Sequence, residues 1–260
     1  MNDTDERIAA HYDDLADHWV DIVTSSERAD SLWSILDEMI PALQGSSALD
    51  AGCGAGVFSD RLADRGAEVT GVDISERMLA RARERVPDAT FHREDISDGL
   101  EPLADDSVDV VLCQHVLSHL SDLGDPLDAF RRVLTDGGAL VVSAHNPAHY
   151  YTLARDGEYP AGGEQAHLDP EIHSPQGGVR YAETQRFDIT WGDGAVANRG
   201  TYFRRPVAGL LGPLLNAGLT LDRVVEPPWN GDPDADGGPD ADGDDDPDFP
   251  PEAICLRATL

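Results

Sequence analysis

The chain has 260 residues, of which 40% are hydrophobic, so it can bury a substantial core and form one large domain or two small ones. Fifty acidic residues against 19 basic ones give a formal net charge of −31, which disfavours nucleic acid as a partner because phosphates are bound by clustered Lys and Arg. No apolar run approaches the roughly 18 residues of a membrane span, and the polar residues 1–6 do not resemble a secretory signal, so we expect a soluble, cytoplasmic protein without a membrane partner.

Two helices are predicted before the first strand. Residues 8–19 predict a short helix with a polar face. Apolar residues then recur at helical spacing from Leu32 to Ile40, and Pro41 ends that pattern.

The most informative stretch is a strand that runs into closely spaced glycines. Apolar residues interrupted only by Asp50 lead to Gly52, Gly54 and Gly56, and residues 57–63 form an amphipathic segment directly afterwards. A strand, a glycine turn and a helix N-terminus together let the backbone approach a ligand closely, because no Cβ intrudes. The alternative is an ordinary turn between a strand and a helix.

A second acid favours the ligand interpretation. Residues 68–72 predict a strand that leads to Asp73, 17 residues beyond Gly56, where doubly wound nucleotide-binding folds place a carboxylate on ribose hydroxyls. A dinucleotide fingerprint would need its third glycine at Val57, so an NAD-dependent oxidoreductase is the least favoured of the nucleotide-binding classes.

Strands and helices continue to alternate up to residue 144. Asp95 lies at the end of the third predicted strand, either as a ligand or as an ordinary turn residue. Gln114 and His115 follow the fourth, at the edge where open α/β sheets bind ligands. The strands are predicted at residues 90–96, 107–113 and 139–144, and the helices at residues 76–86, with Ser75 as N-cap, and at residues 126–134.

The Asp-x-Gly-x-Gly-x-Gly motif that starts at Asp50, followed by Asp73, resembles the class I S-adenosylmethionine-dependent methyltransferases. The order of strands and helices matches that family over residues 46–146. The resemblance implies a doubly wound α/β fold with helices on both faces. Its sheet would be Rossmann-like, mostly parallel and seven-stranded, with an antiparallel last strand at the edge.

The same resemblance implies a cofactor, S-adenosylmethionine, and a product, S-adenosylhomocysteine. The glycines would cradle the amino-acid part of the cofactor while Asp50 shapes the turn. Asp73 would hold the ribose, and Asp95 with the backbone of Ile96 would meet the adenine. The cofactor-binding residues implied in this way are Tyr12, Asp50, Gly52, Gly54, Gly56, Asp73, Ile74, Asp95, Ile96 and Gln114.

Residues 147–203 depart from the alternation of strands and helices. Residues 157–178 are rich in Gly, Pro and His and predict a long loop, whereas residues 185–191 and 196–203 predict a hairpin. In this fold such an insertion commonly covers the active site and selects the substrate. A loop of this length is seldom without function in a compact domain.

The remainder of the chain predicts one helix and two strands. Pro206 opens the helix and Gly218 closes it, and strands follow at residues 219–225 and 253–259. Arg205-Pro206 and the end of this helix resemble the tail of the type 11 methyltransferases. Residues 230–249 are almost only Asp, Gly, Pro and Ala and predict a disordered acidic loop.

No metal site is predicted. The acidic loop begins like a calcium-binding EF-hand at Asp232, but its twelfth position is Gly243 rather than glutamate. Cys53, Cys113 and Cys255 lack metal-ligand spacing and lie in or beside apolar runs, which favours small buried side chains. The absence of lysine and the excess of aspartate over glutamate resemble proteins of salt-adapted organisms.

We therefore predict a single methyltransferase domain over residues 1–260. The segment from Tyr12 to Trp19 resembles the N-terminal segment that folds over the cofactor as a lid in these enzymes, although ordinary amphipathic packing would give the same pattern. The predicted parts are N-terminal helices at 1–45, a cofactor-binding core at 46–146, a substrate-side insertion at 147–203, and the last helix and strands at 204–260.

The predicted reaction is methyl transfer to a small molecule. A nitrogen or oxygen acceptor needs a base, and His115 and His145, which follow the fourth and fifth strands, are the candidates. DNA amino-methylating enzymes of this fold carry Asn/Asp-Pro-Pro-Tyr/Phe where this chain has Cys113-Gln114-His115. A tRNA-nucleoside methyltransferase, suggested by Asn146 and the segment at Tyr12, and a cofactor-binding sensor without catalysis remain alternatives.

Overall fold

The computed structural model describes Asp13 and residues 27–149, 151, 171–173, 180–191, 198–227, 251 and 253–260. The helix predicted over residues 8–19, apart from Asp13, and the acidic loop at residues 230–249 lie outside the described residues. Among the described residues, no helix has the length and apolar character that crossing a membrane requires.

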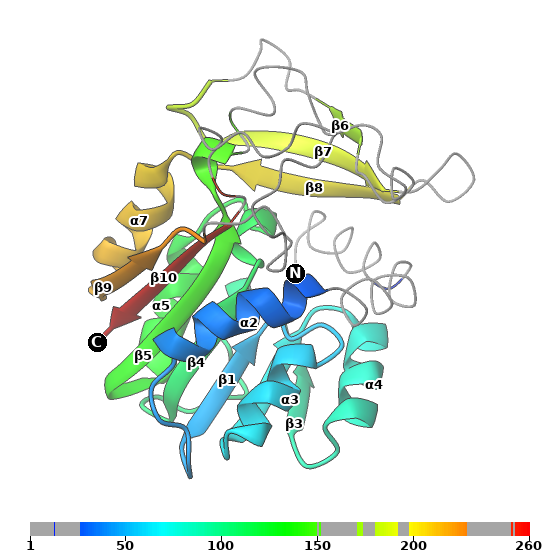
Figure 1. Ribbon diagram of the computed structural model, residues 1–260, viewed down its shortest axis with the longest axis vertical. Helices are drawn as coiled ribbons and strands as arrows, with labels where there is room; N and C mark the ends of the chain where they lie inside the picture. Colours follow the sequence, from blue (N-terminus) through cyan, green and yellow to red (C-terminus); the bar gives the residue numbers. More distant parts are fainter. Residues whose placement is uncertain are drawn as a thin grey trace, which may run out of the picture.

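A seven-stranded sheet forms the centre of the molecule (Figure 1), in the order β3-β2-β1-β4-β5-β10-β9. Strand β10 pairs antiparallel with both of its neighbours, and the pairings from β3 to β5 are parallel. The predicted α/β class and the antiparallel last strand are thereby confirmed. The strands are β1 Ser47–Ala51, β2 Glu68–Asp73, β3 Thr90–Arg93, β4 Val108–Gln114, β5 Leu134–His145, β9 Thr220–Val225 and β10 Ala253–Thr259.

The predicted place of the last strand was wrong. Strand β10 lies between β5 and β9, and β9 is the edge strand. The physical reason is burial: Cys255 and Leu256 of β10 are almost completely buried on opposite faces of the sheet, whereas Val224 on β9 is 48% exposed. An apolar strand of this kind is more stable with a neighbour on each side.

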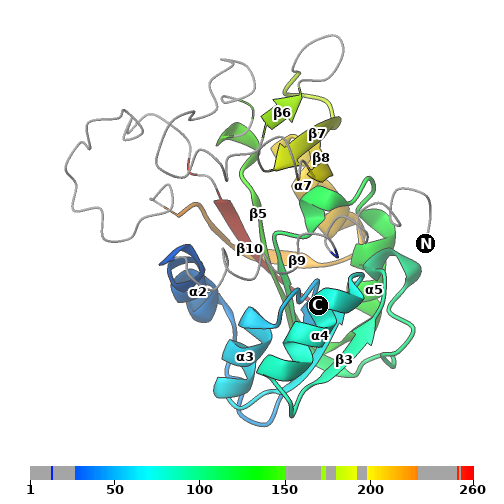
Figure 2. The same ribbon diagram turned by 90° about the vertical axis from the view of Figure 1, so that its right-hand side faces the viewer.

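Helices cover both faces of this sheet (Figure 2). Helices α2 and α3 pack on one face and α5 and α7 on the other, and α4 packs beside α3 against Phe91 and Val86. The helices are α2 Glu27–Met39, α3 Val57–Asp64, α4 Glu76–Arg85, α5 Gly124–Val133 and α7 Val207–Asn216, with short 3-10 helices η1 Ile96–Asp98 and η2 Leu117–His119.

Strand β4 shows why the sheet needs both layers. Val110 and Leu112 lie in the apolar cluster under α2 and α3, whereas Val111 and Cys113 lie in the cluster under α5 and α7. All four side chains are fully buried, as the period of two along a strand requires when both faces are covered. The carboxyl ends of β1, β2, β4 and β5 consequently meet at one rim of a rigid core.

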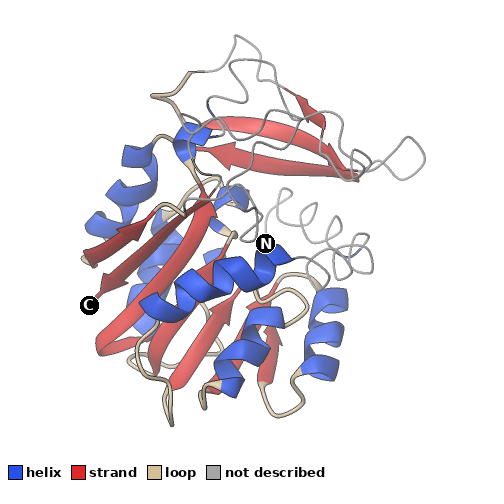
Figure 3. Ribbon diagram, viewed as in Figure 1, coloured by secondary structure: helices blue, strands red, loops and turns tan. Residues whose placement is uncertain are grey.

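A second, antiparallel sheet of three strands lies beyond the carboxyl end of β5 (Figures 1 and 3). It consists of β6 Glu171–His173, β7 Gln185–Trp191 and β8 Asn198–Arg204. The predicted hairpin is thus confirmed. Strand β6 was missed, because it lies inside the stretch predicted as loop and three residues are too few to show a period of two.

Some predicted boundaries also differ. Strand β3 ends at Arg93 rather than at residue 96, because Asp95 caps the 3-10 helix η1 that begins at Ile96. Helix α5 begins at Gly124 rather than Pro126, because Asp122 accepts a hydrogen bond from the Gly124 N–H at 2.6 Å and proline is tolerated in the first turn. Strand β5 begins at Leu134 rather than Ala139, because Leu134 already pairs with Val108 across a register shift.

Candidate functional site

The glycine loop lies between the ends of β1, β2 and β4. The N–H groups of Gly52 and Cys53 donate to the carbonyl oxygen of Val72 at 2.8 and 3.0 Å, which ties the loop to β2. A Cβ on Gly52 would lie 2.2 Å from Cγ2 of Val116, a residue that follows β4. Gly52 therefore allows the loops after β1 and β4 to touch, and any side chain there would separate them.

The other two glycines have different surroundings. Gly56 has a φ of +78° and its position for a Cβ is 3.0 Å from the Cα of Ala82 on α4, so it permits close packing of loop and helix. Gly54 has a φ of +51°, and a Cβ there would have no atom of the described residues within 4 Å. The loop is thus packed against protein at Gly52 and Gly56 and open at Gly54, which leaves bare backbone facing outward for a ligand.

Asp50 supports the loop from beneath. Its side chain is 1% exposed, and Oδ2 accepts a hydrogen bond from the Ser59 hydroxyl at 2.6 Å. Burial raises the pKa of Asp50 to about 7; the Ser59 hydrogen bond opposes this rise and the nearby Asp73 carboxylate adds to it. The structure therefore places Asp50 inside the protein, where it can shape the turn.

Asp73 connects the loop to the start of α4. Its Oδ2 accepts from the Gly54 N–H at 2.8 Å, and its Oδ1 accepts from the Ser75 N–H at 2.9 Å. Burial raises the pKa of Asp73 despite these two hydrogen bonds. Each carboxylate oxygen has two lone pairs, so the group can still accept hydrogen bonds from a ligand.

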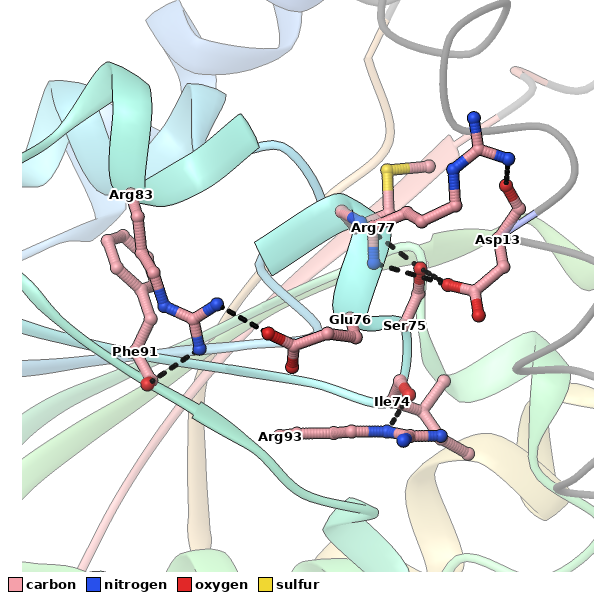
Figure 4. Close-up of polar contacts among 9 residues, drawn as sticks. Asp13, Ile74, Ser75, Glu76, Arg77, Arg83, Phe91 and Arg93 are labelled. Carbon is pink, nitrogen blue, oxygen red and sulfur yellow. Dashed lines mark hydrogen bonds and ion pairs between the residues drawn. The ribbon is translucent and has the colours of Figure 1, made fainter. Parts of the chain in front are cut away.

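Ser75 is the N-cap of α4, as predicted, and it also contacts the N-terminal segment (Figure 4). Its hydroxyl accepts from the Met78 N–H at 3.2 Å and donates to Oδ1 of Asp13 at 2.5 Å. The backbone N–H of Arg77 donates to the same oxygen at 3.3 Å, and the Arg77 guanidinium donates to the Asp13 carbonyl at 2.6 Å. Tyr12 itself lies outside the described residues.

The predicted adenine residues have local roles in this structure. Asp95 caps η1 by accepting from the Ser97 N–H at 2.9 Å, and the Ile96 side chain is buried in the core. The Ile74 carbonyl accepts from the Arg93 guanidinium at 3.0 Å (Figure 4). Gln114 is half-buried at the end of β4, opposite Ser143 of β5. Asp95 therefore has at least the ordinary turn role that was considered for it, because its side chain caps η1.

Two of the predicted histidines come together at the rim of the sheet. His115 directly follows β4 and His145 ends β5, and their ring centroids are 5.0 Å apart. His115 has a φ of +54°, an uncommon value for a side chain of this size, and its N–H donates to the Ser143 carbonyl at 2.9 Å. Both imidazoles are half-buried.

The second sheet adds residues that the sequence did not identify. Tyr202 on β8 is 8% exposed; its ring centroid is 4.3 Å from that of His119 and 5.8 Å from that of His145, to which it is nearly parallel. Tyr202 thus joins the two histidine-bearing loops to the insertion. In the sequence, Tyr202 is only an aromatic residue in a predicted hairpin. That pattern does not indicate which side chains of the hairpin face the core.

Arg205 holds the loop after β4 in place. Its guanidinium is 8% exposed and donates to the carbonyl oxygens of Leu117, at 3.0 Å, and of Leu120. Burial lowers the pKa of Arg205 to about 10, and the nearby Asp122 carboxylate opposes this. In the sequence, Arg205 stands out only as part of a tail motif.

Metal binding has no support in the described part of the chain, where no group of three or more His, Cys, Asp or Glu side chains is arranged to hold an ion. What the site offers is a backbone loop open at Gly54, a carboxylate at the end of β2 and imidazoles after β4 and β5. The carboxyl ends of parallel strands are where α/β proteins of the nucleotide-binding class hold their ligands.

Comparison with known proteins identifies this class further. A family described as "Methyltransferase domain" matches residues 49–142. The ubiquinone biosynthesis O-methyltransferase of Pseudomonas paraeruginosa is 30% identical over 168 residues, which cover 61% of this chain and 72% of that protein. The corresponding enzyme of Stutzerimonas stutzeri is 29% identical over the same shares.

Solved structures show the same fold. An S-adenosylmethionine-dependent methyltransferase from Mesorhizobium loti superposes with a TM-score of 0.61 at 23% identity and covers 88% of this chain and 98% of its own. The Burkholderia thailandensis 1,6-didemethyltoxoflavin-N1-methyltransferase, with its substrate and S-adenosylhomocysteine bound, gives 0.60 at 15% identity and covers 98% and 87%.

The chain belongs to the class I S-adenosylmethionine-dependent methyltransferases. It is a methyltransferase enzyme, and its cofactor is S-adenosylmethionine. The residues present fit this cofactor, because the bare backbone at Gly54 lies beside a half-buried carboxylate, Asp73, that retains lone pairs for sugar hydroxyls.

Proposed function

We propose that the protein methylates a small molecule and binds its cofactor across the carboxyl ends of β1, β2 and β3. The observation that carries this proposal is the position of Asp73. Its carboxylate is held by the N–H groups of Gly54 and Ser75 beside the open face of the glycine loop. In open α/β sheets this crevice is where nucleotides bind.

Most of the predicted cofactor residues then have a proposed task. Asp50 supports the loop from beneath, the loop backbone faces the amino-acid part, Asp73 accepts from the ribose, and the η1 region faces the adenine. The proposed cofactor site comprises Tyr12, Asp50, Gly52, Gly54, Gly56, Asp73, Ile74, Asp95, Ile96 and Gln114.

When bound, S-adenosylmethionine supplies a methyl group already activated by the positive charge on its sulfur. The protein contributes position and proton transfer. His145 and His115 lie on neighbouring strand ends, and an imidazole is the side chain that most often takes a proton from a reacting group. Tyr202 stacks on His145 and so helps to fix the orientation of that ring.

We infer that the acceptor is a planar aromatic molecule with an ionisable O–H or N–H group. The half-buried imidazole of His145 lies at the rim of the sheet, and rings stack favourably on aromatic faces of this kind. Relatives named ubiquinone biosynthesis O-methyltransferases and a neighbour with bound 1,6-didemethyltoxoflavin support an acceptor of this kind. The insertion at residues 147–203 would select it within the single domain.

A tRNA-nucleoside substrate has less support. The side chain of Asn146, which suggested it, donates to Glu226 at 2.8 Å and accepts from the Ala148 N–H at 3.0 Å, so its amide is engaged within the protein. The net charge of −31 also works against binding a polyanion. Turnover that disappears when tRNA is removed would reinstate this alternative.

Calorimetry with S-adenosylhomocysteine and with NAD tests the cofactor site. We expect S-adenosylhomocysteine to bind and NAD not to bind. Asp73→Ala should raise the Kd about 10- to 100-fold, because hydrogen bonds to a charged group contribute roughly 1.5–3 kcal/mol. Asp88→Asn, an exposed acid before β3, is the matched control and should leave the Kd unchanged. An unchanged Kd for Asp73→Ala, or tighter binding of NAD, would contradict the proposal.

Methylation of metabolite extracts with labelled cofactor then identifies the acceptor. With that acceptor, the variant of the catalytic base, His145→Gln or His115→Gln, should lower kcat while the Kd for S-adenosylhomocysteine stays the same. Saturable cofactor binding without any labelled product from a broad panel of acceptors would instead favour a sensor without catalysis.

A further inference from the structure

Asp13 is the one described residue of the N-terminal segment, and its carboxylate lies at the start of α4 (Figure 4). It accepts hydrogen bonds from the Ser75 hydroxyl at 2.5 Å and from the Arg77 N–H at 3.3 Å. The Arg77 guanidinium also holds the backbone carbonyl of Asp13 at 2.6 Å. Side chain and backbone of Asp13 are therefore both bound to the same helical turn, although more than 60 residues separate them in sequence.

Ser75 links this contact to the proposed cofactor site. Its N–H donates to Oδ1 of Asp73, and its hydroxyl donates to Oδ1 of Asp13. Ser75 is fully buried, so a lost partner for its hydroxyl cannot easily be replaced by water. Two hydrogen bonds through one serine thus connect Asp13 to the carboxylate that we place on the ribose.

The start of α4 does not need Asp13 in order to form. The Ser75 hydroxyl already caps the helix by accepting from the Met78 N–H, and Glu76 in the first turn suits the helix dipole. Another contact of this turn, the ion pair of Glu76 with Arg83 at 2.7 Å, points away from Ser75 and Asp13 (Figure 4). The helix therefore carries one contact that leads to the cofactor site and one that does not.

We propose that Asp13 is a positioning residue of the cofactor site. Its contact fixes Ser75, and through it Asp73, in the arrangement that accepts the nucleoside. Binding of the nucleoside and binding of Asp13 to α4 then strengthen each other, as two linked equilibria must. This inference rests on the proposed placement of the ribose on Asp73.

Calorimetric Kd values for S-adenosylhomocysteine test the proposal in the wild type, in three further variants and in Asp73→Ala. Asp13→Ala should raise the Kd about tenfold, because it leaves the buried Ser75 hydroxyl without its acceptor. Asp13→Asn keeps an acceptor oxygen and should stay within about threefold of the wild type. Glu76→Gln breaks only the exposed ion pair with Arg83 and should leave the Kd unchanged.

The variants separate the possible outcomes. A wild-type Kd for Asp13→Ala overturns the proposal, and so does an Asp13→Asn variant as weak as Asp13→Ala, since the charge and not the contact with Ser75 would then matter. If Asp73→Ala also binds with the wild-type Kd, the placement of the ribose fails as well. If only Asp73→Ala is weakened, the placement stands and the role of Asp13 fails.

Hydrogen exchange provides a second measurement, whose response to the ligand would not depend on Asp13 if this residue had only a structural role. The Arg77 amide donates to Asp13, so its exchange rate reports whether that contact is made. Saturating S-adenosylhomocysteine should slow this exchange in the wild type and should have no such effect in Asp13→Ala. Equal slowing in both proteins would overturn the linkage between Asp13 and the cofactor.

Discussion

Asp50 and Asp73 place two carboxylates around one glycine loop, and each has a different task. Asp50 is 1% exposed and bound to Ser59, whereas Asp73 is half-buried and holds two N–H groups at the rim. Burial raises the pKa of both acids. The loop is therefore built at a cost in stability near neutral pH, which the core of the domain offsets.

The pKa of Asp50 leads to a prediction about stability. It rises from 3.8 to about 7 on folding, so between these values the folded state keeps a proton that the unfolded chain has lost. The contribution of Asp50 to stability is complete below pH 3.8 and is lost as the pH rises through about 7. Asp50→Asn still accepts from Ser59 but does not titrate.

The free energy of unfolding, measured with urea, should therefore fall less steeply with rising pH in Asp50→Asn than in the wild type. From pH 5 to pH 7 the difference between the two proteins should be about 2 kcal/mol, since one proton corresponds to roughly 1.4 kcal/mol per pH unit. The pKa of Asp73 is also raised, so the free energy of unfolding of the variant still falls with rising pH, but with a smaller slope. Identical slopes would show that Asp50 is ionised in the folded state near pH 5.

At the scale of single residues, the sequence identified the groups that belong to local motifs. Asp73 and the cap at Ser75 follow from a strand end and a helix start, and the structure has both elements where they were predicted. The contact between Ser75 and Asp13 and the stacking of Tyr202 on His145 join distant segments. No local pattern predicts such pairs, because packing and not propensity determines them.

The helices and strands were largely predictable, because most of the signals that mark them are also local in the sequence. Strand β4 is a near-continuous apolar run, strand β1 leads directly into the glycine loop, and helix α4 has its own cap and a proline just beyond its end. The order of β9 and β10 was not predictable from these patterns. It depends on which faces the distant helices α2 and α7 cover.

The loop after β4 is the element on which catalysis should depend most. Val116 packs against Gly52 on the cofactor side, and Arg205 binds the Leu117 and Leu120 carbonyls on the side of the second sheet. Arg205→Gln should free those carbonyls, each at a cost of about 1–3 kcal/mol. We expect the loop that carries His115 and His119 to shift as a result.

Steady-state kinetics with the acceptor identified from extracts measures this effect. Arg205→Gln should lower kcat/KM for the acceptor about tenfold, which corresponds to roughly 1.4 kcal/mol, with the Kd for S-adenosylhomocysteine unchanged. Arg186→Gln, an exposed arginine on β7, is the control and should keep the wild-type kcat/KM. A parallel loss of cofactor affinity in Arg205→Gln would mean that the two halves of the site are not independent.

For the whole molecule, the excess of negative charge determines how stability responds to salt. The formal net charge is −31, and the described ion pairs, such as Arg61 with Asp30 and Arg223 with Glu38, lie at the surface, where such pairs contribute little. Repulsion among the remaining carboxylates opposes the compact state. Salt reduces this repulsion, because the screening length falls from about 10 Å at 0.1 M to about 3 Å at 1 M.

The unfolding temperature should therefore rise by at least about 5 °C between 0.1 and 2 M KCl, a change of roughly 1–2 kcal/mol for a domain of this size. Most of the rise should occur below about 1 M if screening is its cause. A series in glucose or sucrose at matched osmolarity is the control, because these solutes do not screen charge. A Tm that does not change with KCl would contradict this account.

The second sheet shares no strand pairing with the first in the described part of the chain, and it is inserted between β5 and α7. Mutations in it can consequently accumulate without disturbing the hydrogen bonding of β1 to β5. Under the role proposed for the insertion, exchanging the second sheet as a module would change the acceptor preference and leave the strands that carry the proposed cofactor site unchanged. Grafting the module from a homologue is accordingly a rational route to altered selectivity.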